Sequence, residues 1–454
     1  MRIIQSNPQK KLYFQEITVK EGNAPERTEI GIVNIFDEIE YQPVLGFGGA
    51  FTESAAYLYS CMDADQKKRF MEGYFSREKG IGYNFGRTHI NSCDFSLDIY
   101  TYVEKGDKDL STFSLERDRK YIIPFLKDAL AYCKEDLVFF ASPWSPPDYM
   151  KDNDSAIRGG SLKEEYKELW ALYYAKYIKA MAAEGVTIRA ISVQNEPMAK
   201  QSWESCYYSP EDEGDFVERY LAPVLDREGL SHIKIIIWDH NKERVYDRSK
   251  KIFSSPAVRE RVWAVGHHWY SGDHFEGMRL VHERFDKVLI SSEICGSINE
   301  DAHALAERYG KELFGDFGNF TGAFCDWNLL LSEQGGPFHN RSSKSVACAG
   351  VIFEDKSQGC HAPILYDTKK KELIFTPIYY YIGHFSKFVQ RGALRVATTK
   401  YSEQIYAIAF KNPDGSLVAV LMNVADSALP VVLRREDVCT EFKMEPHSIA
   451  TVLL

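Results

Sequence analysis

The stretch 188–197, IRAISVQNEP, ends in side chains that can transfer protons. It begins as an apolar, β-branched run, which is typical of a strand buried on both faces. It ends with Asn195 and Glu196, and Pro197 then prevents the strand from continuing. A buried strand that carries an amide and a carboxylate at its carboxyl end predicts that Glu196 is a catalytic acid/base.

A second carboxylate, Glu293, ends the run VLISSE (288–293). Cleavage of a glycosidic bond needs two opposed carboxylates, one to protonate the leaving oxygen and one to attack the anomeric carbon or activate water. We expect Glu293 to be the ionised nucleophile, held by neighbouring donors. We expect Glu196 to start protonated, because the negative charge of Glu293 raises its pKa. A glutamate alone at a strand end is more often a salt-bridge or capping residue, so the hypothesis depends on the pair.

The central part of the chain alternates between expected strands and helices. Most of the strands are apolar without alternation, as in parallel strands covered by helices. The expected strands are 44–50, 83–90, 137–143, 188–194, 234–239, 261–269, 288–292 and 320–326. Helices are expected at 114–133, at 161–185 with a capping box from Ser161 to Glu164, and at 209–228, where Ser209 precedes Pro210.

Eight such units predict an α/β fold, a (β/α)8 TIM barrel. A doubly wound open sheet is the alternative, but it needs a glycine-rich phosphate turn, and the glycines of 46–49 have the wrong spacing. Both ends of the chain indicate β structure, with strands at 12–19 and 30–36 and a hairpin of 405–411 and 417–423. We therefore expect a small side β-sandwich built from both termini, 1–40 and 391–454, beside a catalytic barrel of 41–390.

Functional residues of such a barrel lie at the carboxyl ends of its strands. These positions hold carboxylates, amides and aromatic rings, and strands four and seven lie roughly opposite each other. In strand order from the second strand they are Asn91 to Asp94, Trp144, Asn195 and Glu196, Asp239 and His240, His267 to Tyr270, Glu293, and Asp326 with Trp327.

Other catalytic classes have weaker support. His267 and His268 are adjacent and point to opposite faces of a strand, so they cannot bind one metal ion. His240 and His268 with Asp239 could form a site, but no HxH or HExxH spacing is present, and the GxSxG of a serine hydrolase is absent. We expect neither a metal nor a cofactor.

Composition excludes several partners. The net charge of -10 argues against nucleic acid or an anionic membrane, and no stretch is apolar enough to span a bilayer. The nine cysteines are scattered without CxxC spacing, and the N-terminus lacks the apolar core of a signal peptide. These features predict a cytoplasmic protein with reduced thiols; its oligomeric state is not indicated.

The chain resembles glycoside hydrolase family 30, the glucosylceramidase-like family. The matching motifs are GFGGAFTES (46–54), NSCDFSL (91–97), ASPWSPPDYMK (141–151), VQNEP (193–197), HHWY (267–270), SSEIC (291–295), DWNLLL (326–331), GGPFHN (335–340) and GHFSKF (383–388). The resemblance implies a barrel with a side β domain, and a retaining mechanism with Glu196 as acid/base and Glu293 as nucleophile.

The same resemblance implies substrate contacts. Asp94 and Trp144 match residues that hold the non-reducing sugar, and Asn195 matches the amide beside the 2-hydroxyl. The remaining matches are Tyr270 beside the nucleophile, Trp327 as a stacking ring and Asn340, with His268, Asp239 and Trp203 as further candidates. Residues 343–358 are expected to form an extra loop.

The sequence therefore predicts a retaining exo-acting β-glycosidase for β-glucosides or short β-linked oligosaccharides. Its substrate is a small carbohydrate, since an intracellular enzyme meets imported sugars and not polymers. Alternatives within the family are a β-xylosidase, a β-fucosidase or an endo-β-1,6-glucanase. From another class, a catalytically dead carbohydrate-binding barrel would require the loss of a catalytic carboxylate, and both are present.

Overall fold

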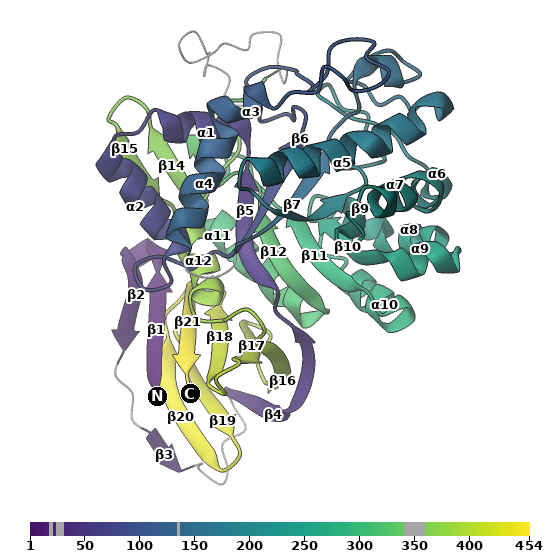
Figure 1. The fold of residues 1–454 in the computed structure, drawn as a ribbon. Coiled ribbons are helices and arrows are strands. Elements are labelled where there is room, and N and C mark those ends of the chain that lie inside the picture. Colours follow the sequence, from purple (N-terminus) through teal and green to yellow (C-terminus); the bar gives the residue numbers. More distant parts are fainter. Residues whose placement is uncertain (18–20, 24–30, 134–136, 340–358) are drawn as a thin grey trace.

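Eight parallel strands form a closed barrel in the computed structural model, which describes residues 1–17, 21–23, 31–133, 137–339 and 359–454 (Figure 1). Neighbours around the barrel follow the order β10-β11-β12-β5-β6-β7-β8-β9. The strands are β5 (Gly46–Phe51), β6 (Phe85–Ile90), β7 (Val138–Pro143), β8 (Ile188–Ser192), β9 (Lys234–Asn241), β10 (Val262–His268), β11 (Val288–Glu293) and β12 (Thr321–Asp326). All eight expected strands lie in this barrel, which excludes the doubly wound sheet.

Apolar side chains fill the interior of the barrel. They include Phe85, Phe140 and Ile236, which are buried together with smaller residues of the neighbouring strands. The first strand lies close to its neighbour, because a Cβ on Gly48 would lie 1.4 Å from the Phe85 carbonyl oxygen. The glycines of 46–49 thus permit close strand packing and form no phosphate turn.

Helices surround the barrel, and their apolar faces pack on its outer surface as one large core (Figure 1). The α-helices are α1 (Glu53–Ser60), α2 (Ala64–Phe75), α3 (Glu116–Lys120), α4 (Ile122–Tyr132), α5 (Lys167–Ala183), α6 (Pro210–Phe216), α7 (Ala222–Arg227), α8 (Val245–Ile252), α9 (Pro256–Arg261), α10 (Glu276–Phe285), α11 (Ala302–Gly318) and α12 (Pro377–Ser386). Four short 3-10 helices are η1 (Pro8–Lys10), η2 (Asp148–Met150), η3 (Glu164–Tyr166) and η5 (Lys242–Arg244), and η4 (Val217–Leu221) is a π-helix.

The helix starts were predicted with mixed success. Ser209 accepts a hydrogen bond from the Asp212 amide and Pro210 takes the first helical position, as expected. The capping box from Ser161 to Glu164 is wrong: Ser161 pairs with Tyr207 in a β-bridge, and the α-helix begins only at Lys167. The expected helix 114–133 is divided at Tyr121, whose backbone leaves the helical region.

Strands from both ends of the chain form one ten-stranded sheet beside the barrel, where N and C lie close together in Figure 1. Its order is β2-β1-β21-β18-β17-β16-β4-β19-β20-β3. The strands are β1 (Arg2–Asn7), β2 (Leu12–Ile17), β3 (Glu21–Asn23), β4 (Ile32–Pro43), β16 (Leu394–Lys400), β17 (Ile405–Lys411), β18 (Leu417–Asn423), β19 (Leu429–Arg435), β20 (Val438–Met444) and β21 (Ser448–Leu453). The side domain from both termini and the expected hairpin (β17 and β18) are therefore confirmed.

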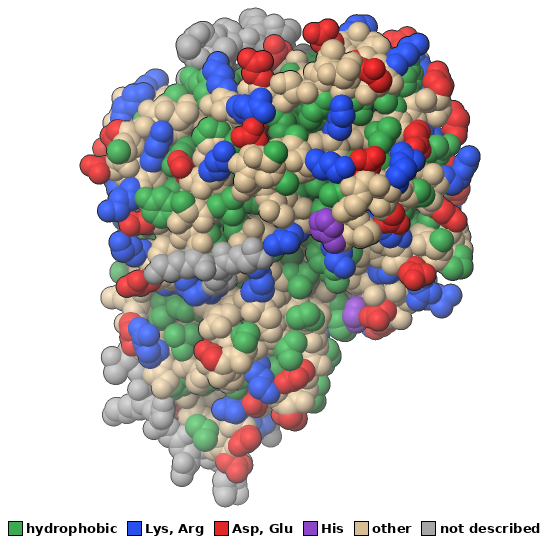
Figure 2. All heavy atoms as spheres, in the orientation of Figure 1, with side chains coloured by type: hydrophobic (Ala, Val, Ile, Leu, Met, Phe, Trp, Pro, Cys, Tyr) green, Lys and Arg blue, Asp and Glu red, His purple; other side chains and the backbone are tan. Residues whose placement is uncertain are grey.

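A further three-stranded sheet was not expected from the sequence; it consists of β13 (Leu330–Ser332), β14 (Ile364–Asp367) and β15 (Glu372–Phe375). Within the described ranges, no helix has the length and apolar character needed to cross a membrane. On the face shown in Figure 2, acidic and basic side chains are interspersed.

Candidate active site

A cavity of about 380 Å³ opens at the carboxyl ends of the barrel strands. It is lined by Asp94, Trp144, Asn195, Glu196, Gln201, Trp203, His240, Asn241, Tyr270, Glu293, Cys295, Gly296, Ser297, Trp327, Gly359 and Cys360. This set includes both expected catalytic glutamates and most of the expected sugar contacts. Asp239 and His268 are buried beneath the lining, and Asn340 and the expected loop 343–358 lie outside the described residues.

A larger depression of about 720 Å³ lies at the opposite end of the barrel, where Lys234, Val262 and Val288 begin their strands. In this fold the amino ends of the strands serve stability, and chemistry occurs at the carboxyl ends. We therefore place the active site in the smaller cavity.

Backbone hydrogen bonds fix the end of β8. The Asn195 amide donates to the Pro143 carbonyl at 2.9 Å, and the Glu196 amide donates to the Asp239 carbonyl at 3.0 Å. These bonds join Glu196 to the strands on either side of β8. Its backbone has a φ of 47°, a left-handed conformation that is costly for a residue with a side chain. The chain thus holds Glu196 in one orientation at the mouth of the barrel.

Glu293 ends β11 and is held by two donors. Nη1 of Arg87 donates to its Oε2 at 2.7 Å, and the Tyr270 hydroxyl donates to its Oε1 at 2.9 Å. Nη2 of Arg87 also donates to Oδ1 of Asn195 at 2.9 Å. The expectation that neighbouring donors hold Glu293 is therefore met in the geometry.

Asp239 connects strands all around the barrel. It receives hydrogen bonds from five side chains, namely Arg87 at 2.8 Å, Ser142 at 3.0 Å, Ser192 at 2.6 Å, His268 at 3.0 Å and Ser292 at 2.6 Å. Burial alone would raise the pKa of Asp239, but the charges of Arg87 and His268 with these hydrogen bonds lower it far below its usual range. Asp239 is therefore a fixed negative charge under the cavity.

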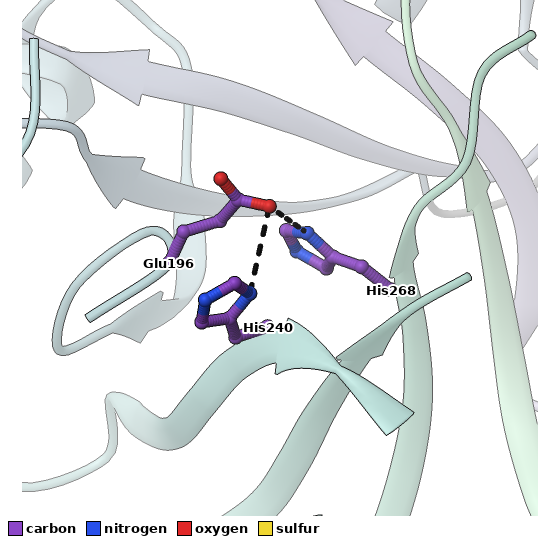
Figure 3. A group of neighbouring side chains, drawn as sticks. All are labelled: Glu196, His240 and His268. Carbon is purple, nitrogen blue, oxygen red and sulfur yellow. Dashed lines mark hydrogen bonds and ion pairs between the residues drawn. The ribbon is translucent and has the colours of Figure 1, made fainter. Parts of the chain in front are cut away.

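Two imidazoles face Glu196 (Figure 3). Nδ1 of His268 lies 3.3 Å from Oε1 of Glu196, and Nδ1 of His240 lies 3.5 Å from the same oxygen. Nδ1 of His268 is also 3.9 Å from Oε1 of Glu293, so one imidazole faces both carboxylates that the sequence predicts to be catalytic. His267 points away from this site and bonds Thr321, as expected for adjacent residues of a strand.

The charges around the two glutamates differ from those expected. Burial raises the pKa of Glu196, but the hydrogen bond from His268 and the charges of both imidazoles outweigh it and bring the pKa to about 2. Burial, which outweighs the opposing charges of His268 and Arg87, raises the pKa of Glu293, and the charge of Glu196 adds to this. The expectation of a raised Glu196 pKa is therefore wrong, because it left out the two imidazoles that the fold brings next to this carboxylate.

His268 carries the proton instead. Burial lowers the pKa of a histidine, but the negative charge of Glu293 and the hydrogen bonds to Asp239 and Glu196 raise the pKa of His268 to about 9. At neutral pH the site therefore holds an ionised Glu196 in contact with an imidazolium.

Aromatic rings form one wall of the cavity. Trp144 and Trp327 stack with ring centroids 5.1 Å apart, and the Arg87 guanidinium lies 4.8 Å from the Trp144 ring. Trp203 packs against the same apolar cluster from the loop after β8. Flat apolar rings beside buried polar groups suit the faces and hydroxyls of a sugar.

Several site residues were missed by the sequence analysis. Arg87 had a signal, because an arginine inside an apolar strand demands a buried acidic partner. His240 was noted at a strand end and in a possible metal site with His268 and Asp239, but not as a contact of Glu196. Gln201, Cys295 and Cys360 lie in loops whose course no local pattern reveals.

Within the described chain, Glu196, His240 and His268 form a cluster whose ligand atoms lie close enough to share a metal ion.

Comparison with known proteins agrees with this architecture. The model of the glycosyl hydrolase family 30 TIM-barrel domain matches residues 44–389, and that of the family's beta sandwich domain matches 392–452. The chain is 30% identical over 453 residues to the lysosomal acid glucosylceramidase of Mus musculus, covering 94% of this chain and 84% of the relative.

Two solved structures are also similar. The crystal structure of SrfJ from Salmonella typhimurium superposes with a TM-score of 0.93 at 32% identity, covering 100% of this chain and 99% of that one. An endo-β1,6-glucanase superposes with a TM-score of 0.86 at 27% identity, with the same coverage of both chains.

Proposed function

The chain belongs to glycosyl hydrolase family 30, and from this premise we propose that it is a retaining, exo-acting β-glycosidase. Its proposed substrates are β-glucosides or short β-linked oligosaccharides. The observation that carries the proposal is that Glu196 and Glu293 line one cavity and both approach Nδ1 of His268, at 3.3 Å and 3.9 Å.

The first step is glycosylation of Glu293. Glu196, after taking the Nδ1 proton of His268, gives it to the glycosidic oxygen while Oε1 or Oε2 of Glu293 attacks the anomeric carbon. The bond from that carbon to the leaving oxygen breaks, and the aglycone departs as an alcohol. Arg87 and Tyr270 hold the attacking carboxylate in position.

The second step reverses the roles. Glu293 is now an ester without charge, so His268 loses a partner that kept its pKa high. Glu196, as a carboxylate, takes a proton from water, whose oxygen attacks the anomeric carbon and breaks the bond to Glu293. The proton on Glu196 returns to His268, and the site regains its starting state. Two displacements at one carbon retain its configuration.

Exo action is supported by the small size of the cavity. Asp94, Trp144 and Trp203 line it, and its volume is about 380 Å³. A small cavity suits one terminal sugar, whereas an endo-acting enzyme needs an extended groove. We assign Asp94 and Trp144 to the sugar hydroxyls, Asn195 to the 2-hydroxyl and Trp327 to stacking, in line with the family resemblance.

An endo-β-1,6-glucanase is the second candidate, favoured by the superposition with a solved enzyme of that name over nearly the whole of both chains. A β-xylosidase or β-fucosidase would use the same chemistry on another sugar. A carbohydrate-binding protein without activity has the least support, because Glu196 and Glu293 both line the cavity. We also propose a cytoplasmic location, which the scattered spacing of the nine cysteines supports.

A panel of aryl glycosides tests the proposal. The purified protein should hydrolyse the β-glucoside faster than the xyloside, fucoside and galactoside, and the first-formed product should be the β-anomer by proton NMR. Glu293→Gln should lower kcat at least a thousandfold, since covalent catalysis needs the ionised carboxylate. Wild-type rates in Glu293→Gln, or inversion at the anomeric carbon, would contradict the mechanism, and release of mixed-length fragments from a β-1,6-glucan would favour the endo enzyme.

A further inference from the structure

Three potential metal-ligand atoms converge at the edge of the cavity: Oε1 of Glu196, Nδ1 of His240 and Nδ1 of His268 (Figure 3). The two nitrogens lie 3.5 Å and 3.3 Å from the carboxylate oxygen, and all three atoms lie within 4.8 Å of one another. Ligands about 2.0–2.1 Å from a tetrahedral zinc ion are separated by roughly 3.3 Å. The two measured spacings therefore match the edges of a tetrahedral site.

The imidazoles are arranged as metal ligands usually are. Nε2 of His268 contacts Oδ1 of Asp239 at 3.0 Å, and this carboxylate fixes the ring so that Nδ1 faces Glu196. Metal-binding histidines commonly use their second nitrogen in this way. The His240 side chain is only 13% exposed, and its buried Nδ1 makes no hydrogen bond to any described residue. A buried nitrogen without a hydrogen bond calls for a physical explanation.

The charge of the cluster also favours a cation. Asp239 and Glu293 share the guanidinium of Arg87, and Nδ1 of His268 lies near Glu196 and Glu293. Once His268 has given up its Nδ1 proton, the three carboxylates of Glu196, Asp239 and Glu293 outnumber the one guanidinium among these residues. A divalent ion would compensate this excess directly beside Glu196.

We propose that Glu196, His240 and His268 form an inhibitory site for a divalent transition metal ion with nitrogen and oxygen preference, such as Zn²⁺. The ion displaces the Nδ1 proton of His268 to water and coordinates Oε1 of Glu196 and the two Nδ1 atoms, and the cavity supplies water as the fourth ligand. A metal-bound Glu196 can neither deliver a proton to a glycosidic oxygen nor take one from water. The inhibition rests on the proposed role of Glu196, whereas metal binding does not.

Binding is measured with Co²⁺, whose visible absorption reports tetrahedral coordination, on the chelator-treated full chain. Wild-type protein should take up one Co²⁺, and added Zn²⁺ should displace it. His240→Ala and Glu196→Gln should each weaken binding at least about tenfold, because each removes one of the three ligands. His232→Ala removes an exposed histidine just before the start of β9, the strand whose carboxyl end carries His240, and this variant should bind as wild type does. His240→Gln repeats the test if the alanine variant does not fold.

Inhibition is then measured with Zn²⁺, relative to the metal-free rate of each protein. The concentration of Zn²⁺ that halves the rate should rise at least tenfold in His240→Ala and stay unchanged in His232→Ala. The absence of Co²⁺ bands in the wild type, or equal binding by wild type, His240→Ala and Glu196→Gln, would overturn the site. Equal inhibition of wild type and His240→Ala would also overturn it. Metal binding by a protein without hydrolase activity would refute the proposed function and support the metal site.

Discussion

Replacement of His268 by asparagine should move the acid/base chemistry by several pH units. The asparagine amide keeps a donor near the position of Nδ1 but removes a positive charge 3.3 Å from Oε1 of Glu196. Two unit charges at this distance interact by about 5 kcal/mol at an effective dielectric constant of about 20, which is roughly 3–4 pKa units. The pKa of Glu196, which is about 2 beside His268, should therefore rise to about 5–6 in the variant.

The assay is the pH dependence of kcat/KM for an alkyl β-glucoside, whose leaving group needs protonation. In the wild type, Glu196 and His268 together keep one proton up to the pKa of His268 at about 9, so the rate should fall only above that pH. In His268→Asn the proton is held by Glu196 alone, and the alkaline limb should move down to about pH 5–6. At pH 8 the variant should thus be at least about a hundredfold slower than at its own optimum.

A dinitrophenyl β-glucoside serves as the control, because its leaving group departs without a proton. With this substrate the alkaline limb should not move between wild type and His268→Asn. Two results would refute the reasoning: an alkaline limb near pH 9 in the variant with the alkyl glucoside, or a loss of rate that is equal at every pH. The second result would mean that His268 only supports the structure.

Three further substitutions test the surrounding contacts. Tyr270→Phe removes the hydroxyl that donates to Glu293 at 2.9 Å. Since a hydrogen bond to a charged group contributes about 1.5–3 kcal/mol, kcat for an aryl β-glucoside should fall about 10- to 100-fold. An unchanged kcat would contradict this. Arg87→Met leaves Asp239 and Glu293 without their shared cation, so urea denaturation should show a loss of about 3–5 kcal/mol in unfolding free energy; a loss below 1 kcal/mol would mean that other groups compensate. Burial raises the pKa of Glu204 to about 8, so its ionisation destabilises the fold as pH rises from its ordinary pKa near 4.5 towards 8. Glu204→Gln should therefore raise the melting temperature at pH 8 and leave it unchanged at pH 4. A lower melting temperature of the variant at pH 8 would oppose this.

The barrel was predictable because each of its strands carries the signal within itself. A run such as 235–238, IIIW, is apolar at every position, and its burial can be predicted without knowledge of the neighbouring strands. The first strand of the chain, Arg2–Asn7, was not predicted, because its place in the sheet depends on pairing with Ser448–Leu453, at the other end of the sequence. Ser161 shows the opposite failure, since a local capping pattern lost to a long-range bridge with Tyr207.

The site was predictable in its residues but not in its charges. Glu196 and Glu293 were found because both end apolar strands that the fold brings to one rim. Their protonation depends on distances between side chains of different strands, and His268 reaches Glu196 only because β8 and β10 flank β9 in the closed barrel. No spacing in the sequence contains that information. The same applies to Arg87, whose partners lie on β9 and β11.

Asp239 connects the barrel strands to the charges of the site. It does not line the cavity, yet it accepts hydrogen bonds from side chains on β6, β7, β8, β10 and β11. The charge of Glu293 and the hydrogen bond to Asp239 keep His268 protonated, and protonated His268 keeps Glu196 ionised. In the proposed mechanism, Glu196 can receive its proton from His268 only while these charges are in place. The acid/base behaviour of the cavity therefore depends partly on Asp239, a buried carboxylate outside the cavity lining.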